Sequence, residues 1–102
     1  MLKRENRLSR ILRRVGEKKY FSPLFQVRIS ENNDNKARFG FIVSKKIDKR
    51  AVVRNKTKRV LRDAAKTLID NVLGKDIIII AKKDLSFKEK EEVKKELGNI
   101  LN

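Results

Sequence analysis

Residues 76–81 read DIIIIA, and this short run restricts the architecture more than any other part of the chain. Its four consecutive isoleucines do not alternate with polar residues, and β-branched side chains favour extended backbone. The run is far shorter than the roughly 18 apolar residues of a membrane-spanning helix. The pattern therefore predicts an interior strand that is buried on both faces of a sheet.

Three segments before this run are candidates for the other strands. Residues 25–29 alternate apolar and polar side chains, and residues 38–44 (RFGFIVS) return with the same alternation. The turn-forming run ENNDNK at 31–36 separates them, so we expect these two strands to form a hairpin. Residues 18–21 are a candidate short edge strand, which Pro23 separates from the next one. One face of the hairpin is mixed, as expected for partial cover, and carries Gln26, Arg28, Arg38, Gly40, Ile42 and Ser44.

Helical periodicity marks three further segments. Residues 2–15 carry an apolar stripe opposite Arg and Lys, which favours a helix laid on the core over a membrane-surface helix. A second helix spans residues 51–73 and ends at Gly74, a good left-handed cap. A capping box at 86–89 opens the last helix. The inward side chains of this last helix are Phe87, Val93, Leu97, Ile100 and Leu101.

These segments predict a single domain over residues 1–102. Its fold class is α/β, as an α+β sandwich with a small mixed sheet of three to four strands and three helices. The expected order is helix, strands, helix, strand, helix. The absence of cysteine fits a reducing cytoplasm, and no secretory signal or membrane span is evident. We therefore expect a cytoplasmic protein.

The net charge of +15 is concentrated in the first three-fifths of the chain. Residues 1–62 hold 20 of the 28 Lys and Arg but only 5 of the 13 Asp and Glu, whereas the two signs balance in residues 63–102. An uncompensated basic block repels itself and usually serves a polyanion. We expect nucleic acid as the partner, with an anionic membrane surface or solubility alone as the alternatives.

Residues 51–66, AVVRNKTKRVLRDAAK, separate this charge onto one side of a helix. At about 100° per residue, one arc holds Val53, Thr57, Val60, Leu61, Ala64, Ala65 and Leu68. The opposite arc holds Arg54, Asn55, Lys58, Arg59, Arg62 and Lys66. The cations extend over roughly 18 Å of helix, which matches a few successive phosphates. Arginine binds phosphate oxygens in pairs, and an asparagine can bind a base edge or a 2′-hydroxyl.

The residues just before this helix extend the basic surface, and they are Lys45, Lys46, Lys49 and Arg50. Any one of these cations is by itself more typical of an ordinary solvated surface. The inference depends on their clustering, because no carboxylate occurs between Lys49 and Arg62.

A self-contained active site finds little support in the sequence. Histidine, the commonest general base, is absent, and the 4 glycines are too scattered for a phosphate-binding loop. The aspartates form no recognisable pair, so we predict no metal site in the protein. The predicted strands also argue against a helix-turn-helix DNA-binding protein, which would be mostly helical.

Residues 40–64, GFIVSKKIDKRAVVRNKTKRVLRDA, resemble the signature of the protein component of bacterial ribonuclease P. The elements that carry the resemblance are Ser44-Lys45-Lys46, Ala51-Val52, Arg54-Asn55, Lys58-Arg59 and Arg62. The NRL at 6–8 and the DIIIIAKK at 76–83 also fit, so the resemblance covers nearly the whole chain.

The resemblance implies an α–β sandwich with a left-handed βαβ crossover around the basic helix. It also implies that a large RNA uses Mg²⁺ to hydrolyse precursor transfer RNA and release the 5′ leader. The protein would be monomeric within this ribonucleoprotein, without a bound metal or membrane of its own. It would dock on ribonuclease P RNA through the basic helix and hold the single-stranded leader between the first helix and the exposed face of the sheet.

Carried over residue by residue, two sets of contacts follow from the resemblance. The RNA-binding set is Lys45, Lys46, Arg50, Arg54, Asn55, Lys58, Arg59, Arg62 and Lys66. The leader cleft set is Leu8, Leu12, Tyr20, Arg28, Arg38 and Ser44. Family members carry aromatic residues in the first helix and first long strand, where this chain has aliphatic residues and Arg28. Phosphate contacts would then replace part of the base stacking, unless Tyr20 and Phe21 restore a stacking surface rather than join the core.

A structural RNA-binding module of the ribosomal-protein kind, without a processing role, remains the alternative. It would share the basic helix and the sheet. The two functions differ in the RNA that they bind, since the alternative predicts ribosomal RNA as the partner.

Overall fold

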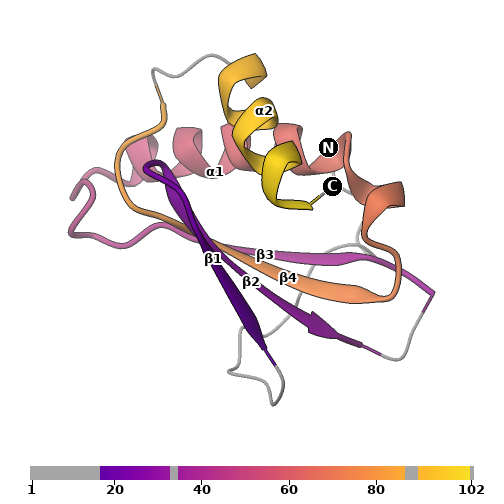
Figure 1. The fold of residues 1–102 in the computed structure, drawn as a ribbon. Helices are drawn as coiled ribbons and strands as arrows, with labels where there is room; N and C mark the ends of the chain where they lie inside the picture. The colour runs from indigo at the N-terminus through magenta and orange to yellow at the C-terminus, as the bar shows by residue number, and fades with distance from the viewer. Residues whose placement is uncertain (1–16, 33–34, 87–89, 102) are drawn as a thin grey trace.

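A computed structural model describes residues 17–32, 35–86 and 90–101 of the chain. The helices and strands in these ranges are β1 (Lys18–Phe21), β2 (Phe25–Glu31), β3 (Arg38–Ile42), α1 (Ala51–Lys66), a short 3₁₀ helix (Ile69–Asn71), β4 (Lys75–Ala81) and α2 (Lys90–Leu101). One sheet forms a layer, and α1 and α2 form a second layer on one side of it (Figure 1). The predicted helix at 2–15 and most of the capping box at 86–89 lie outside the described residues.

The four strands follow the order β1-β2-β4-β3, so β4 lies in the interior of the sheet as predicted. Its neighbours are β2, which is antiparallel, and β3, which is parallel. The predicted hairpin between the second and third strands is wrong, because β4 inserts between them. The hairpin is formed by β1 and β2 instead. The crossover from β3 to β4 contains α1, and its left-handed sense stays a prediction.

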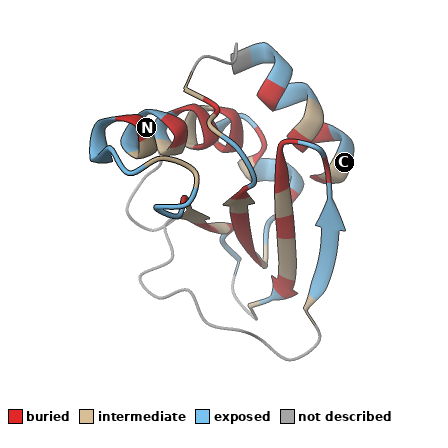
Figure 2. Ribbon diagram, turned by 90° about the vertical axis from the view of Figure 1, so that its left-hand side faces the viewer, coloured by how far each residue is buried: buried red, intermediate tan, exposed pale blue. Residues whose placement is uncertain are grey.

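The core lies between the sheet and the two helices. Strand side chains that point toward the helices include Phe25, Val27, Phe39, Ile77 and Ile79, all at most 1% exposed. Leu61 of α1 and Leu97 of α2 meet them and are fully buried. Figure 2 shows the contrast across the sheet: β1 is exposed along its whole length, whereas β2 is mainly buried or half-buried and β4 is so throughout. The apolar side chains that alternate along β2 and the isoleucines of β4 therefore form one continuous apolar layer under the helices.

Helix α1 is shorter than the periodicity predicts, ending at Lys66 rather than near residue 73. The chain then forms the 3₁₀ helix, which lets Leu68 and Val72 still reach the core. Gly74 is the turn residue before β4 and not a helix cap. Its φ of 80° requires left-handed backbone, which glycine adopts without steric cost.

The face of the sheet opposite α1 and α2, here called the far face, is built from rows of aligned residues. One row contains Phe21, Gln26, Ile80 and Ile42, and the next contains Lys19, Arg28, Ile78 and Gly40. A third row contains Ser30, Asp76 and Arg38. Polar and apolar side chains are mixed on this face, as the sequence predicts.

No helix in the described ranges is both long enough and apolar enough to cross a membrane.

Candidate RNA interface

The two sides of α1 differ as the sequence predicts. The predicted apolar arc is buried along its whole length, from Val53 to Leu68. On the opposite side Asn55, Arg59 and Lys66 are exposed, and Arg54, Lys58 and Arg62 are half-buried. The cations are thus held along one rigid helix, because the apolar flank is fixed against the sheet and α2.

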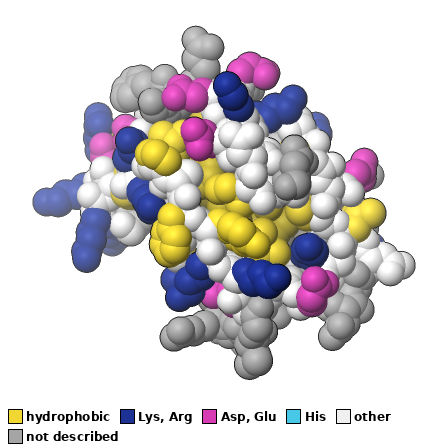
Figure 3. Space-filling view, viewed as in Figure 1, with side chains coloured by type: hydrophobic (Ala, Val, Ile, Leu, Met, Phe, Trp, Pro, Cys, Tyr) yellow, Lys and Arg dark blue, Asp and Glu magenta, His cyan; other side chains and the backbone are white. Residues whose placement is uncertain are grey.

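The segment 43–50 joins β3 to α1 and extends the basic surface. Lys45, Lys46 and Lys49 are exposed in it. Ser44 holds the turn, because its backbone oxygen accepts the Ile47 N–H at 3.1 Å and its Oγ accepts the Lys46 N–H at 3.2 Å. Lys and Arg side chains gather at the left of Figure 3, over this segment and the start of α1.

Arg54 anchors this segment to the helix. Its Nη1 donates hydrogen bonds to the backbone oxygens of Asp48 at 3.1 Å and Lys49 at 2.8 Å. One face of the guanidinium is therefore used inside the protein. The predicted RNA contact of Arg54 stays a prediction, but the residue also has a structural role that the sequence did not reveal.

Arg50 carries a partnered charge. Its Nη2 lies 3.0 Å from Asp48 Oδ2, and its Nε donates to Asp48 Oδ1 at 3.1 Å. The hydrogen bonds from the side chain and backbone of Arg50, helped by the charge of Arg50, lower the pKa of Asp48 to about 2. Asp48 thus remains a carboxylate at neutral pH and offsets one cation of the basic surface.

Arg62 lies over an aromatic ring at the edge of the sheet. Its guanidinium carbon is 5.9 Å from the centroid of the Phe41 ring, a cation–π arrangement. Its Nε is buried and makes no hydrogen bond. The contact with Phe41 fixes the direction of the side chain, whereas Arg59, one helical turn before it on the outer side, is exposed.

Thr57 ties α1 to the segment that follows β4. Its Oγ1 donates to Asp84 Oδ1 and accepts the Leu85 N–H, both at 3.2 Å. Hydrogen bonding with Ser86 and then with Thr57 lowers the pKa of Asp84, so its carboxylate stays charged. The sequence placed Thr57 in the apolar arc, and it is indeed fully buried. The hydroxyl of Thr57 in an otherwise apolar stripe was the feature of the sequence that could have predicted these hydrogen bonds.

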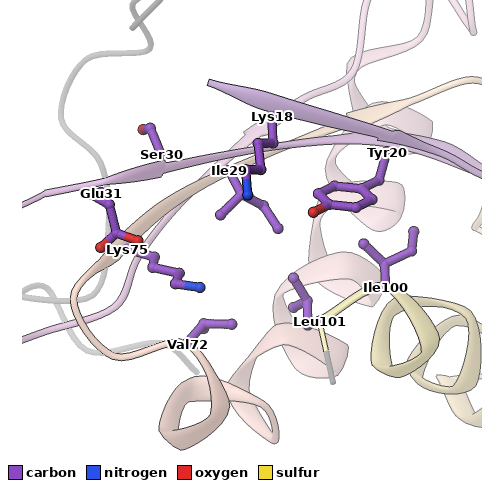
Figure 4. A pocket seen from close by; sticks show the side chains of 9 residues that line it. All are labelled: Lys18, Tyr20, Ile29, Ser30, Glu31, Val72, Lys75, Ile100 and Leu101. Atoms are coloured by element: carbon purple, nitrogen blue, oxygen red, sulfur yellow. The ribbon is translucent and has the colours of Figure 1, made fainter. Parts of the chain in front are cut away.

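Among the predicted leader cleft residues that the structure describes, Tyr20 lies on the opposite face of the sheet from Arg28 and Arg38. Leu8 and Leu12 lie outside the described residues. Tyr20 is paired with Val27, whose side chain is in the core, so Tyr20 points to the helix side. Figure 4 shows it over a cavity of about 330 Å³ beside Ile100 and Leu101 of α2. The prediction that Tyr20 shares a cleft with Arg28 is therefore wrong, because alternation along β1 and β2 puts them on opposite faces.

Arg38 lies on the far face but is engaged in an ion pair. Its Nε and Nη2 donate to the two carboxylate oxygens of Asp76 at 2.8 and 3.2 Å. The Asp76 side chain is fully buried and also accepts a hydrogen bond from Asn32 at 3.0 Å. This network fastens the β2–β3 connection to the start of β4, which gives Arg38 a structural role.

Arg28 has a looser environment on the same face. Its Nε is 3.8 Å from Glu17 Oε1 and makes no hydrogen bond. The side chain as a whole is 29% exposed. Of the far-face cations predicted for the cleft, Arg28 is the one held less tightly.

Phe21, which the sequence offered with Tyr20 as an alternative stacking residue outside the leader cleft set, lies on the far face. Its side chain is 66% exposed, and the Lys82 Nζ lies 5.1 Å from the centroid of its ring. The signal was available in the alternation of β1, since Phe21 follows Tyr20 and must point the opposite way. Which of the two points outward depends on the hairpin register, which the sequence did not fix.

Within the part of the chain that the structure describes, no three Asp, Glu, His or Cys side chains come together as a metal site.

Comparisons with known proteins agree with this geometry. The whole chain, residues 1–102, matches the family model described as Ribonuclease P. The ribonuclease P protein component of Marinomonas sp. is 41% identical over 64 residues, which is 63% of this chain and 48% of that protein. That of Xanthomonas oryzae pv. oryzae is 49% identical over 49 residues, which is 48% of this chain and 34% of that protein. The matched regions thus span about a third to a half of the length of these relatives.

Two solved structures share the fold. The RNase P protein from Thermotoga maritima superposes with a TM-score of 0.75 at 28% identity, covering 84% of this chain and 82% of that chain. The Staphylococcus aureus RNase P protein superposes with a TM-score of 0.70 at 31% identity, covering 83% and 78%. A family match over residues 1–102, with the fold shared by two solved relatives, establishes that this chain belongs to the ribonuclease P protein family.

Proposed function

We propose that the chain is the protein subunit of a bacterial ribonuclease P and that it assists removal of the 5′ leader from precursor transfer RNA. The observation that carries the proposal is the one-sided charge of α1 in a chain of this family. Its buried flank fixes the helix, and its outer flank offers several cations and Asn55 to a polynucleotide. Phosphate contacts of this kind supply most of the affinity in protein–nucleic acid complexes.

Docking on ribonuclease P RNA is the part of this function that we assign to α1 and the segment 43–50. Lys45, Lys46 and Lys49 precede the helix and continue its charged side. Arg54 holds this segment against the first turn, so the loop cations and the helix cations form one surface. A preorganised surface loses less conformational entropy on binding than a set of free side chains.

We assign the single-stranded leader to the far face of the sheet. Arg28 is half-buried there with no hydrogen bond at its Nε, and Ser44 lies where β3 leaves the sheet for the basic segment. An RNA strand on this face would therefore be contiguous with RNA bound along α1. Arg38 contributes less, because Asp76 already holds its guanidinium.

The chemistry of phosphodiester hydrolysis is assigned to the RNA subunit and its Mg²⁺ rather than to this chain. Histidine is absent from the sequence, and Asp48, in the segment before α1, is kept ionised by Arg50. What the protein residues supply is binding: they neutralise phosphates and orient the substrate. A cytoplasmic location and a single copy of the protein per ribonucleoprotein follow from this assignment as proposals.

Reconstitution tests the proposal directly. The protein is combined with a bacterial ribonuclease P RNA, and cleavage of a precursor transfer RNA is measured at low Mg²⁺ with and without the protein. The proposal predicts strong stimulation by the wild-type chain. Equal rates with and without protein would overturn it, and ribosomal RNA as the main co-purifying RNA would favour a structural module of the ribosomal-protein kind.

A further inference from the structure

We propose that Phe41 is a positioning residue for RNA docking, because its ring holds the Arg62 guanidinium in the direction in which this group binds an RNA phosphate. The inference rests on the proposed function, since it takes the charged side of α1 as the surface that docks on RNA. It adds to that function a residue that acts through Arg62 and does not itself touch the RNA.

The three arginines of α1 have three different environments. Arg54 already donates hydrogen bonds to backbone oxygens of the segment before the helix. Arg59 is exposed. Arg62 is half-buried, and its guanidinium carbon lies over the Phe41 ring, 5.9 Å from the ring centroid. Of the three, Arg62 is therefore the one whose direction depends on an aromatic side chain.

The core fixes the position of the Phe41 ring. Phe41 stacks on Phe39 of the same strand, with ring centroids 6.3 Å apart and an angle of 10° between the ring planes. Phe39 is 1% exposed and belongs to the core, whereas Phe41 is half-buried on β3 at the edge of the sheet. The order from the core outward is thus Phe39, Phe41 and Arg62, so the cation lies on a ring that is itself held in place.

An aromatic partner fixes a guanidinium without neutralising it. Arg50 is paired with the Asp48 carboxylate, which offsets its charge and occupies two of its nitrogens. The Phe41 ring attracts the Arg62 cation through its π electrons and leaves the net charge in place. Arg62 Nε is buried without a hydrogen bond, so an RNA phosphate would bind the Nη nitrogens of the guanidinium. A side chain that is already oriented loses less conformational entropy when the phosphate binds.

The position of the pair agrees with this role. Arg62 lies one helical turn from Lys58 and from Lys66 on the charged side of α1. Phe41 lies near the end of β3, directly before the basic segment 43–50. The ring thus stands where the sheet, the helix and the basic segment meet. A contact that only stabilises the fold would look the same, but in that case the effect of the ring on RNA affinity would not depend on Arg62.

A double-mutant cycle tests this dependence. Phe41→Leu keeps an apolar side chain and removes the ring, and we expect it to weaken binding to ribonuclease P RNA about 3- to 10-fold. In the Arg62→Ala background the same change should have no effect, whereas in the Arg59→Ala background, the matched control, it should weaken binding as in the wild type. Phe41→Tyr keeps the ring and should restore wild-type affinity. Urea denaturation of each variant gives the folded fraction by which the affinities are corrected.

Two results of the cycle would overturn the positioning role. One is wild-type affinity in Phe41→Leu, and the other is an equal loss of affinity with and without Arg62. Failure of the wild-type chain to bind ribonuclease P RNA or to stimulate cleavage would instead overturn the proposed function, and the role of Phe41 with it.

Side-chain order in the free wild-type protein gives a second readout, which needs neither RNA nor a variant that folds. NMR relaxation of the arginine Nε–H groups should give Arg62 an order parameter near that of rigid backbone, about 0.85, and the exposed Arg59 a value below about 0.6. Equally low order at the two arginines would overturn the positioning role even if RNA binding were normal.

Discussion

Helices α1 and α2 lie side by side on the same side of the sheet, yet they present different surfaces to solvent (Figure 1). Each buries an apolar stripe on the core, with Leu61 and Leu97 fully buried at its centre. Residues 51–66 carry six Lys and Arg against the single acid Asp63, whereas residues 90–101 carry three Lys and three Glu. The buried flanks of the two helices are alike, and their outer flanks are not.

The comparison shows that an amphipathic pattern gives information about packing, whereas the sign of the charge on the outer flank gives information about function. An apolar stripe at helical spacing predicts only that a helix packs on a core. Mixed charges on the other side, as in α2, need no further explanation than solvation. An outer flank with charges of one sign, as in α1, is destabilised by repulsion among those charges. Binding to a polyanionic partner accounts for such a flank. Of the four predictions below, the first and the third compare the two helices, and the other two concern charged residues that already have partners inside the protein.

The largest effect should come from truncating the shared inner flank. Leu61→Ala and Leu97→Ala each remove a fully buried side chain and should each lower the free energy of unfolding by about 2–5 kcal/mol. Urea denaturation measures this change. Arg59→Ala is the control because Arg59 is exposed, and a comparable loss of stability in that variant would show that the sides of α1 are misassigned.

The next effect concerns a partnered cation outside the two helices. Arg38→Ala leaves the buried Asp76 carboxylate without its two guanidinium hydrogen bonds and should cost about 1–3 kcal/mol of folding stability. Arg28→Ala is the matched variant on the same face, and its loss should be smaller because Arg28 makes no hydrogen bond through its Nε. Thermal melts of both variants measure the difference. Equal stability of Arg38→Ala and wild type would return Arg38 to the list of ligand-binding candidates.

A smaller but more specific effect should appear in RNA binding. Arg59→Ala should weaken binding to ribonuclease P RNA about 3- to 10-fold and reduce the slope of log affinity against log salt by about one. Lys95→Ala removes an exposed cation from α2 and should leave both quantities unchanged. Filter binding across a salt series measures them. Equal losses in the two variants would mean that charge alone, and not the one-sided arrangement of α1, determines affinity.

The smallest effect concerns pH. The pKa of Asp48 is lowered to about 2 by its hydrogen bonds from Arg50, so its contribution to the fold is complete above the ordinary value near 3.8. The contribution should fade as the pH falls from about 4 toward 2, because protonation removes the charged acceptor. The carboxyl chemical shift of Asp48 in an NMR titration reports the midpoint, and Arg50→Ala should raise it. A midpoint that Arg50→Ala does not move would contradict the pairing.

The strands could largely be predicted from the sequence, but their pairing could not. The isoleucines of β4 revealed an interior strand, and an interior strand needs a neighbour on each side. Strands that follow one another in sequence usually pair, which favoured the incorrect hairpin between residues 25–29 and 38–44. The decisive contacts, such as Arg38 with Asp76, join residues 38 apart in the chain. Short-range patterns carry no information about contacts at that separation.

The site could be predicted where it depends on helical periodicity and not where it depends on register. The two sides of α1 follow from the spacing of Val60, Leu61 and the arginines, and the burial of the apolar side is confirmed. The faces of Tyr20 and Phe21 depend on how the turn at 22–24 closes, and the prediction for Tyr20 was wrong. The hydrogen bonds from Arg54 to backbone oxygens were also missed. They depend on the path of the loop before α1, and no residue pattern encodes that path.

The interior position of β4 has a consequence for how the chain acquires its structure. β2 and β3 do not pair with each other, and each is hydrogen-bonded to β4 instead. In the sequence, β4 comes after the three other strands and after α1. During synthesis, the first seventy or so residues emerge without the strand that joins them. Until residues 75–81 have been made, the backbone hydrogen-bonding groups of β2 and β3 that face β4 have no partner in the sheet. The basic first part of the chain therefore reaches its final form only after β4 has been made.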